Sequence, residues 1–117
     1  MKVLGRRQLL ALLLMTIGLG TASIAGAETP DGELLDGEAL FNQRTCFTCH
    51  GKDGKTPLLP FYPIIAGQNA AYALQQMTDI KSGARANGNS AAMKGVMFLV
   101  NDEEMKILAD YISKLER

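Results

Sequence analysis

Five consecutive residues, Cys46-Phe47-Thr48-Cys49-His50, constrain this 117-residue chain more than any other feature. Two thiols three positions apart can each bond to one of the two vinyl groups along a haem edge. The histidine after the second thiol then lies where it can ligate the iron. The chain has two cysteines and one histidine, and all three fall in this motif. The motif therefore predicts covalent attachment of one c-type haem.

Three other uses of paired cysteines fit the rest of the chain less well. A thioredoxin-type site would need a βαβ pattern, and no apolar run here resembles a parallel strand. A closed zinc site needs four ligands, whereas the cysteines and the histidine supply three, so a carboxylate would have to complete it. A disulfide across two residues would close a very short loop and stabilise the fold little.

Residues 1–27 are expected to be a secretory signal peptide that is cleaved. Lys2, Arg6 and Arg7 give a positive start, residues 9–19 form an apolar stretch, and Ala25-Gly26-Ala27 provides a cleavage pattern. A bilayer span takes about 20 apolar residues, so an uncleaved membrane anchor is the weaker alternative. The twin-arginine pathway exports folded proteins and is disfavoured, because haem is ligated to an unfolded chain outside the cytoplasm. The periplasm is the expected compartment.

Removal of the leader would leave 117 − 27 = 90 residues, enough for one small domain over 28–117. A domain of this size buries a modest core, and a haem at its centre would add to that core. The whole chain has 12 basic and 12 acidic residues, but three of the basic ones lie in the leader. The remainder carries nine against twelve, a net charge of −3. A mildly acidic domain does not favour binding of nucleic acid or anionic lipid.

Three helices are predicted, and no strand pattern or internal repeat is visible, so the fold is expected to be all-α. The first helix spans about 37–44, with Asp36 as its cap. The second spans about 68–81, where apolar residues recur at helical spacing. The third spans about 102–116, and Asn101 with Glu104 forms a capping-box pattern at its start. Its predicted apolar face comprises Met105, Leu108, Ala109, Ile112 and Leu115.

The segments 51–67 and 83–97 are predicted to be irregular. Proline fixes φ and removes a backbone donor, so Pro57, Pro60 and Pro63 make the first segment a shaped loop rather than a helix. The second segment is rich in glycine and asparagine at its start and apolar at its end.

A low-spin haem that transfers electrons usually has a second protein ligand, and the chain offers no second histidine. A methionine thioether is therefore the expected donor. Met77 and Met105 occupy predicted core positions on helices. Met93 follows small residues and precedes a glycine, which suits a strap over the haem, so it is the preferred ligand. Met97 is the fallback, and an open or water-ligated iron is the remaining alternative.

The chain resembles the small class I c-type cytochromes, and most closely one domain of the c-four-type cytochromes. The resemblance covers residues 34–115 and implies three main helices around one covalently bound haem. The run from Phe41 to Cys46 is one residue longer than in the mitochondrial type, and one haem motif is present where c-four proteins carry two domains. The matching residues are Gly37, Phe41, Cys46–Gly51, Pro63–Gln68, Tyr72, Lys81–Arg85, Met93 and Leu108–Tyr111.

The resemblance also implies roles for individual residues. Met93 is the second axial ligand of the iron. The carbonyl of Pro63 accepts a hydrogen bond from the free ring nitrogen of His50. Gly37 and Phe41 contact Tyr111 where the first and last helices cross.

Several other side chains have two possible roles. Arg85 is expected either to hold a haem propionate or to be a solvated loop residue. Tyr72 and Tyr111 are expected to be core aromatics with a wet hydroxyl rather than electron relays. Three lysines either ring the haem edge or are ordinary surface residues: Lys52, Lys55 and Lys94.

These features together predict a periplasmic electron carrier, not an enzyme, that accepts and donates one electron through partner proteins such as a membrane oxidase, a reductase or a periplasmic dehydrogenase. One alternative is a haem subunit of a larger dehydrogenase, for instance a flavin-dependent sulfur-compound oxidoreductase. A large exposed apolar patch around residues 57–63 would favour that alternative. A gas-binding or peroxidatic haem protein with an open site is the third. No nucleic acid and no stable membrane insertion is expected, and a homodimer is left open.

Overall fold

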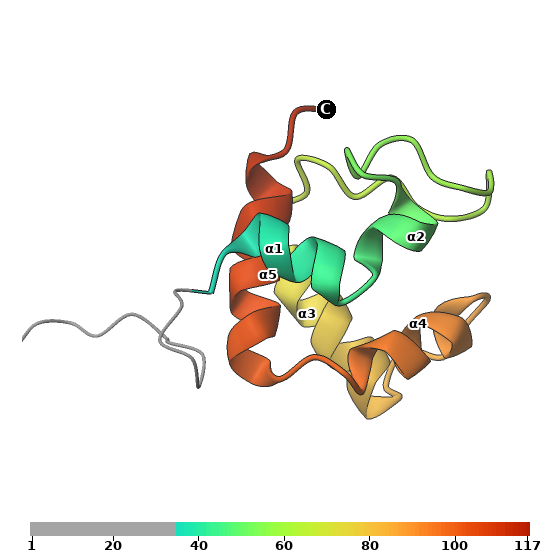
Figure 1. The fold of residues 1–117 in the computed structure, drawn as a ribbon. Coiled ribbons are helices and arrows are strands. Elements are labelled where there is room, and N and C mark those ends of the chain that lie inside the picture. Colours follow the sequence, from blue (N-terminus) through green and yellow to red (C-terminus); the bar gives the residue numbers. More distant parts are fainter. Residues whose placement is uncertain (1–34) are drawn as a thin grey trace, which may run out of the picture.

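The computed structural model describes residues 35–117, and over this range every regular element is a helix, as predicted. Helix α1 (Gly37–Gln43) crosses α5 (Asp102–Lys114), and α3 (Ala70–Ser82) lies behind this pair (Figure 1). Helices α2 (Cys46–His50) and α4 (Ser90–Met97) lie on the other side of the molecule from α5. None of these helices is long and apolar enough to cross a membrane. The predicted signal peptide and its cleavage site lie outside the described residues.

The crossing of α1 and α5 depends on a close approach at Gly37, as the family resemblance implied. A Cβ atom at Gly37 would lie 2.4 Å from the Cβ of Tyr111, so only glycine fits there. One turn later, the rings of Phe41 and Tyr111 pack with their centroids 5.6 Å apart. The Asp36 carboxylate accepts a hydrogen bond from the backbone N–H of Glu38 and caps α1, as predicted.

Helix α5 begins with the predicted capping box. The Asn101 side chain accepts from the backbone N–H of Glu104 at 2.9 Å, and the Glu104 carboxylate accepts from the backbone N–H of Asn101 at 3.0 Å. Two donors that the first helical turn leaves unpaired are thereby satisfied. Four of the five predicted apolar residues of α5 are buried, and the fifth, Leu115, lies just past the end of the helix.

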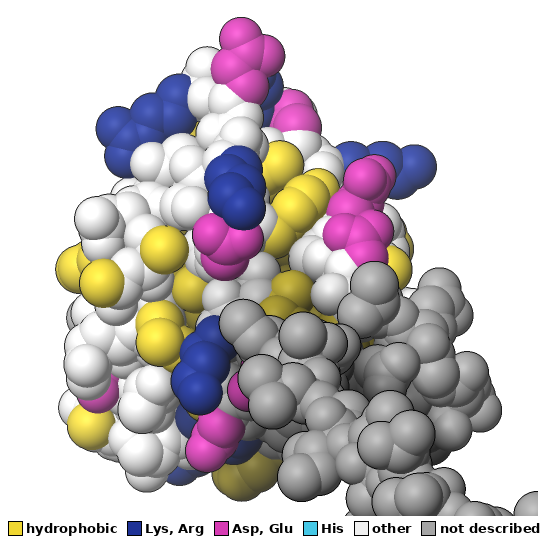
Figure 2. All heavy atoms as spheres, turned by 90° about the vertical axis from the view of Figure 1, so that its left-hand side faces the viewer, with side chains coloured by type: hydrophobic (Ala, Val, Ile, Leu, Met, Phe, Trp, Pro, Cys, Tyr) yellow, Lys and Arg dark blue, Asp and Glu magenta, His cyan; other side chains and the backbone are white. Residues whose placement is uncertain are grey.

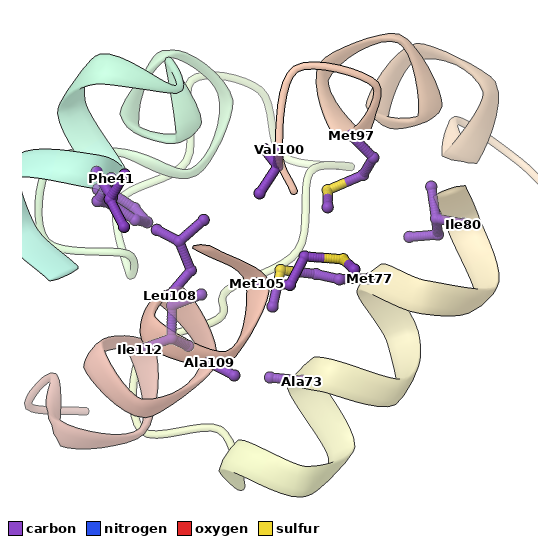
Figure 3. Close-up of a cluster of buried hydrophobic side chains, with 11 residues drawn as sticks. Phe41, Ala73, Met77, Ile80, Met97, Val100, Met105, Leu108, Ala109 and Ile112 are labelled. Atoms are coloured by element: carbon purple, nitrogen blue, oxygen red, sulfur yellow. The ribbon is translucent and has the colours of Figure 1, made fainter. Parts of the chain in front are cut away.

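The core is formed where α3 and α5 face each other, closed by α1 and by the end of α4. Met77 and Met105 are 5% and 3% exposed and pack in this core, as predicted. Figure 3 shows the cluster, which comprises Leu40, Phe41, Ala73, Met77, Ile80, Met97, Val100, Met105, Leu108, Ala109 and Ile112.

The prediction that residues 83–97 are irregular is wrong for the second half of this segment. Ser90–Met97 forms helix α4, although the side chain of its N-cap residue, Asn89, makes no capping hydrogen bond. Two backbone turns start the helix instead, from Ser90 to Asn87 and from Ala92 to Asn89, both at 3.1 Å. With no side-chain cap and a glycine at position 95, its local sequence carries little helix signal.

Tyr72 was expected in the core, and this expectation is also wrong. Its side chain is 51% exposed. The buried face of α3 runs through Ala73, Met77 and Ile80, and successive helical residues are about 100° apart, so Tyr72 lies beside that face and lines the haem cavity instead. Tyr111, by contrast, is half-buried, and burial together with nearby Glu38 and Asp36 raises its pKa.

The side of the molecule on which α5 is exposed carries basic and acidic side chains close together (Figure 2). Two pairs along α5 are of this kind, Lys106 with Glu103 at 3.8 Å and Lys114 with Asp110 at 2.6 Å. Exposed pairs one helical turn apart contribute a few tenths of a kcal/mol each, roughly 0.3–0.5. This side is therefore a solvated helix face.

Candidate haem site

The haem motif forms α2, and a sharp turn sets it off from α1. The backbone N–H of Arg44 donates to Leu40 O at 2.8 Å and closes α1. Thr45 then has a φ of 60°, a left-handed conformation that is uncommon for a β-branched residue. The turn directs both cysteines and His50 toward one cavity.

This cavity has a volume of about 540 Å³, within the range of cofactor sites. The motif and the loop after it form one wall, α4 forms the opposite wall, and α3 and α5 close the base. A second, shallower hollow beside Arg117 contains none of the motif residues and is not a candidate for the haem.

His50 is held in one orientation by the loop. Its side chain is 7% exposed, and its Nδ1 lies 2.8 Å from the carbonyl oxygen of Pro63, the contact that the resemblance implied. A carbonyl can only accept, so Nδ1 carries the proton and Nε2 keeps a free electron pair. Burial lowers the pKa of His50, although the bond to Pro63 opposes this, and the ring is therefore neutral at pH 7. A neutral imidazole held through Nδ1 is a suitable iron ligand.

Backbone hydrogen bonds give the loop that carries Pro63 its shape. The N–H of Leu58 donates to Cys49 O at 3.0 Å, and the N–H groups of Ile65 and Ala66 both donate to Gly54 O. The Asp53 carboxylate accepts from the backbone of Lys55 and from the side chain and backbone of Thr56. These bonds lower its pKa. The predicted shaped loop is thus confirmed, and it contains no helix.

Cys46 and Cys49 are half-buried and not joined to each other. Burial raises the pKa of the Cys46 thiol to about 11, so it stays protonated at neutral pH. Residues 35–117 contain no cluster of three or more His, Cys, Asp and Glu residues able to hold a metal ion, so the zinc alternative lacks its further ligand.

The opposite wall presents two methionines, one helical turn apart on α4. Met93 is half-buried, and Met97 is 2% exposed and packs in the core cluster. Both side chains line the cavity. The structure thus brings His50 and both candidate sulfur ligands to one cavity.

One group of polar side chains on the cavity wall comes from α3 and from the segment after it. Arg85 lines the cavity there, next to Gln76 and Asn87. The sequence singled out Arg85 but neither of its neighbours. Three other predicted residues are not part of the cavity wall: Lys52, Lys55 and Lys94.

An ion pair that sequence reasoning missed ties the motif to α5. The Arg44 guanidinium donates twice to the carboxylate of Glu104, which is 4% exposed. Burial acts to raise the pKa of Glu104, but hydrogen bonds from Arg44 and from the Asn101 backbone outweigh it and lower this pKa. The partners are 60 positions apart, so no local pattern could have revealed the pair.

Two unjoined thiols, a neutral imidazole with a free Nε2, and a mostly apolar cavity fit a covalently attached haem. A cytochrome c family model matches residues 34–116. Cytochrome c4 of Pseudomonas aeruginosa is 35% identical over 91% of this chain and 47% of its own length. Cytochrome c-554(548) of Halomonas halodenitrificans is 38% identical over 62% of this chain and 86% of its own length.

A solved structure shows the same fold. The chain superposes on reduced recombinant cytochrome c4 from Pseudomonas stutzeri with a TM-score of 0.61 and 33% identity, over 68% of this chain and 46% of that one. The chain therefore spans about half the length of the cytochrome c4 proteins it matches. The cofactor is a covalently attached c-type haem, for which the spacing of Cys46 and Cys49 is suited. The chain belongs to the cytochrome c family.

Proposed function

We propose that this chain is an exported electron-transfer protein, with no catalytic residues of its own, in which His50 and Met93 ligate the haem iron. The observation that carries the proposal is that one cavity is lined both by the motif with His50 and by Met93 and Met97 of α4. The bound haem supplies an iron that cycles between the ferric and ferrous states. The protein's residues set the ligation, the orientation and the polarity around it.

Met93 is preferred over Met97 because of what each side chain already contacts. Met97 belongs to the core cluster, so moving its sulfur to the iron would leave a space in that core. Met93 is half-buried at the cavity wall and can turn toward the iron without that cost. A thioether ligand favours the ferrous state and raises the reduction potential.

The test compares Met93→Ala with Met97→Ala in the haem-loaded protein. Met93→Ala is expected to abolish the near-infrared charge-transfer band of His/Met ligation and to lower the potential by tenths of a volt, within the ~0.8 V range that axial ligands span. Met97→Ala is expected to keep the band and to lower stability by about 2–4 kcal/mol through the cavity it creates. The reverse pattern would show that Met97 is the ligand. If the band is absent from the unmutated protein, the site is open.

One observation favours the second candidate, a haem subunit held in a larger complex. The loop after the motif exposes apolar side chains: Leu58 is 68% exposed, and Phe61 and Ile64, which also line the haem cavity, are 59% and 62% exposed. A contiguous exposed apolar patch often marks a protein–protein interface. A further relative, 33% identical over 84 residues, is named a thiosulfate dehydrogenase electron acceptor in Stutzerimonas stutzeri.

Two measurements separate the free carrier from the subunit. The carrier should purify alone from its native source and contain one haem per chain. The subunit should co-purify in fixed ratio with a redox enzyme, and Leu58→Ser, at an exposed position outside the cavity wall, should release it. Mass spectrometry of the same sample also tests export, because cleavage after Ala27 leaves Glu28 as the first residue.

A further inference from the structure

Arg85 is the one permanently charged side chain among the described residues that line the haem cavity. Most of the wall is apolar, and Arg85 lies on it together with the polar side chains of Gln76 and Asn87, which it contacts. A haem is likewise apolar over most of its surface and carries two carboxylates on one edge. This group of polar side chains therefore matches the propionate edge of the cofactor in chemistry.

The Arg85 guanidinium is held from two sides. Its Nη1 donates to the Oε1 of Gln76 at 2.6 Å, and its Nε lies 3.4 Å from the Oδ1 of Asn87, a weaker contact. Its backbone is fixed as well, because its N–H donates to Asp79 O at 2.9 Å after the helix-ending turn at Gly83. Within residues 35–117 the guanidinium is paired with amide oxygens and with no carboxylate.

A guanidinium has five N–H donors, so these two contacts leave its full charge and most of its donors for an anion. The amide oxygens of Gln76 and Asn87 orient the group without neutralising it. A carboxylate in either place would cancel the charge and compete with the cofactor. The cavity thus contains an oriented but unneutralised cation, which is what binding of a haem carboxylate requires.

We propose that Gln76 is a positioning residue, which together with Asn87 holds the Arg85 guanidinium against a haem propionate. The proposal deepens the proposed function and rests on the haem filling the cavity. A propionate bound in this way stays ionised, and the nearby cation stabilises the ferrous iron. When Gln76 cannot hold Arg85, the propionate loses part of this partner and takes up a proton more readily. Loss of the nearby cation lowers the reduction potential where the propionate stays ionised, and uptake of a proton offsets this loss as the pH falls, so the potential becomes dependent on pH.

The experiment measures the reduction potential of the haem-loaded protein from mildly acidic to mildly alkaline pH. The variants are Gln76→Leu, Arg85→Gln and the double variant. Arg85→Gln is expected to lower the potential and to make it pH-dependent, and Gln76→Leu is expected to do the same to a smaller extent. In the double variant Gln76→Leu should add nothing, because its effect passes through Arg85. The propionate bending mode in the resonance Raman spectrum should change in all three.

Gln75→Leu is the matched control. Gln75 is on the same helix, is exposed, and donates to Asp79 Oδ1 at 2.8 Å, away from the cavity. It should leave the potential, its pH profile and the Raman mode unchanged. The proposal is overturned if Gln76→Leu has no effect, or if it has the same effect with and without Arg85. If the unmutated protein gives no pyridine haemochrome spectrum, it contains no haem c, and the proposed function on which this proposal rests is refuted instead.

Discussion

Helices α4 and α5 follow one another in the chain, but different kinds of interaction hold them. Helix α5 starts with a capping box, buries five residues and packs against both α1 and α3. Helix α4 has no side-chain cap, buries Ser90 and Met97, and packs mainly on α3 with its remaining face on the cavity. The comparison indicates that α5 is held mainly by contacts with other helices, whereas α4 depends more on what fills the cavity.

The largest expected effect tests the crossing of α1 and α5. Gly37→Ala places a Cβ 2.4 Å from the Cβ of Tyr111, so the two helices must separate. We expect the free energy of unfolding of the haem-loaded protein to fall by about 3 kcal/mol in a guanidinium titration. A fall in the free energy of unfolding of less than about 0.5 kcal/mol would show that α1 and α5 can separate at little cost.

The Arg44–Glu104 pair is the next test of the contacts that hold α5. Glu104→Gln should cost about 2 kcal/mol at neutral pH, because a buried charged acceptor and one half of the capping box are weakened. The pKa of Glu104 is lowered in the folded state, so its contribution is fully present above the ordinary value of 4.5 and is lost as the pH falls below it. The two stability curves should therefore converge in acid.

Glu103→Gln is the matched control for this measurement. Glu103 is the preceding residue, is 53% exposed in its side chain and makes one long contact with Lys106. Its substitution should change stability by less than about 0.5 kcal/mol at any pH. A pH-independent cost for Glu104→Gln would contradict the ion-pair explanation.

A third prediction tests the dependence of α4 on the cavity. With Met93 as the ligand, as proposed above, excess imidazole should replace its sulfur on the ferric iron and remove the link between α4 and the haem. Amide hydrogen exchange in α4 should then accelerate at least about tenfold, equivalent to ~1.4 kcal/mol, while exchange in α5 stays unchanged. Equal acceleration in both helices would show that they open as one unit.

The smallest effect should be a gain. Gly95 lies inside α4 and is exposed. A Cβ added there would meet no atom within 4 Å. Gly95→Ala should slow exchange in α4 by the equivalent of about 0.5–1 kcal/mol, because alanine loses less backbone entropy than glycine in a helix. No change would indicate that α4 is already fully ordered by its contacts.

The same contrast explains what the sequence predicted well. The capping box at Asn101, the spacing of apolar residues in α3 and α5, and the haem motif are all local patterns, and the structure contains them. Helix α4 was missed because it has no side-chain cap, and the backbone turns that start it leave no pattern in the sequence. The Arg44–Glu104 pair depends on the approach of segments 60 positions apart, and the Gln76–Arg85 contact depends on how the chain turns after α3; residue spacing encodes neither.

The hydrogen bond from His50 to Pro63 has a consequence for the speed of electron transfer. Gain or loss of an electron changes the charge on the iron, and any ligand that must then rotate adds to the reorganisation energy of the reaction. The imidazole is held by a backbone carbonyl in a hydrogen-bonded loop, so we expect its ring to rotate little when the iron changes charge. One carbonyl oxygen thereby lowers the nuclear rearrangement that each turnover requires.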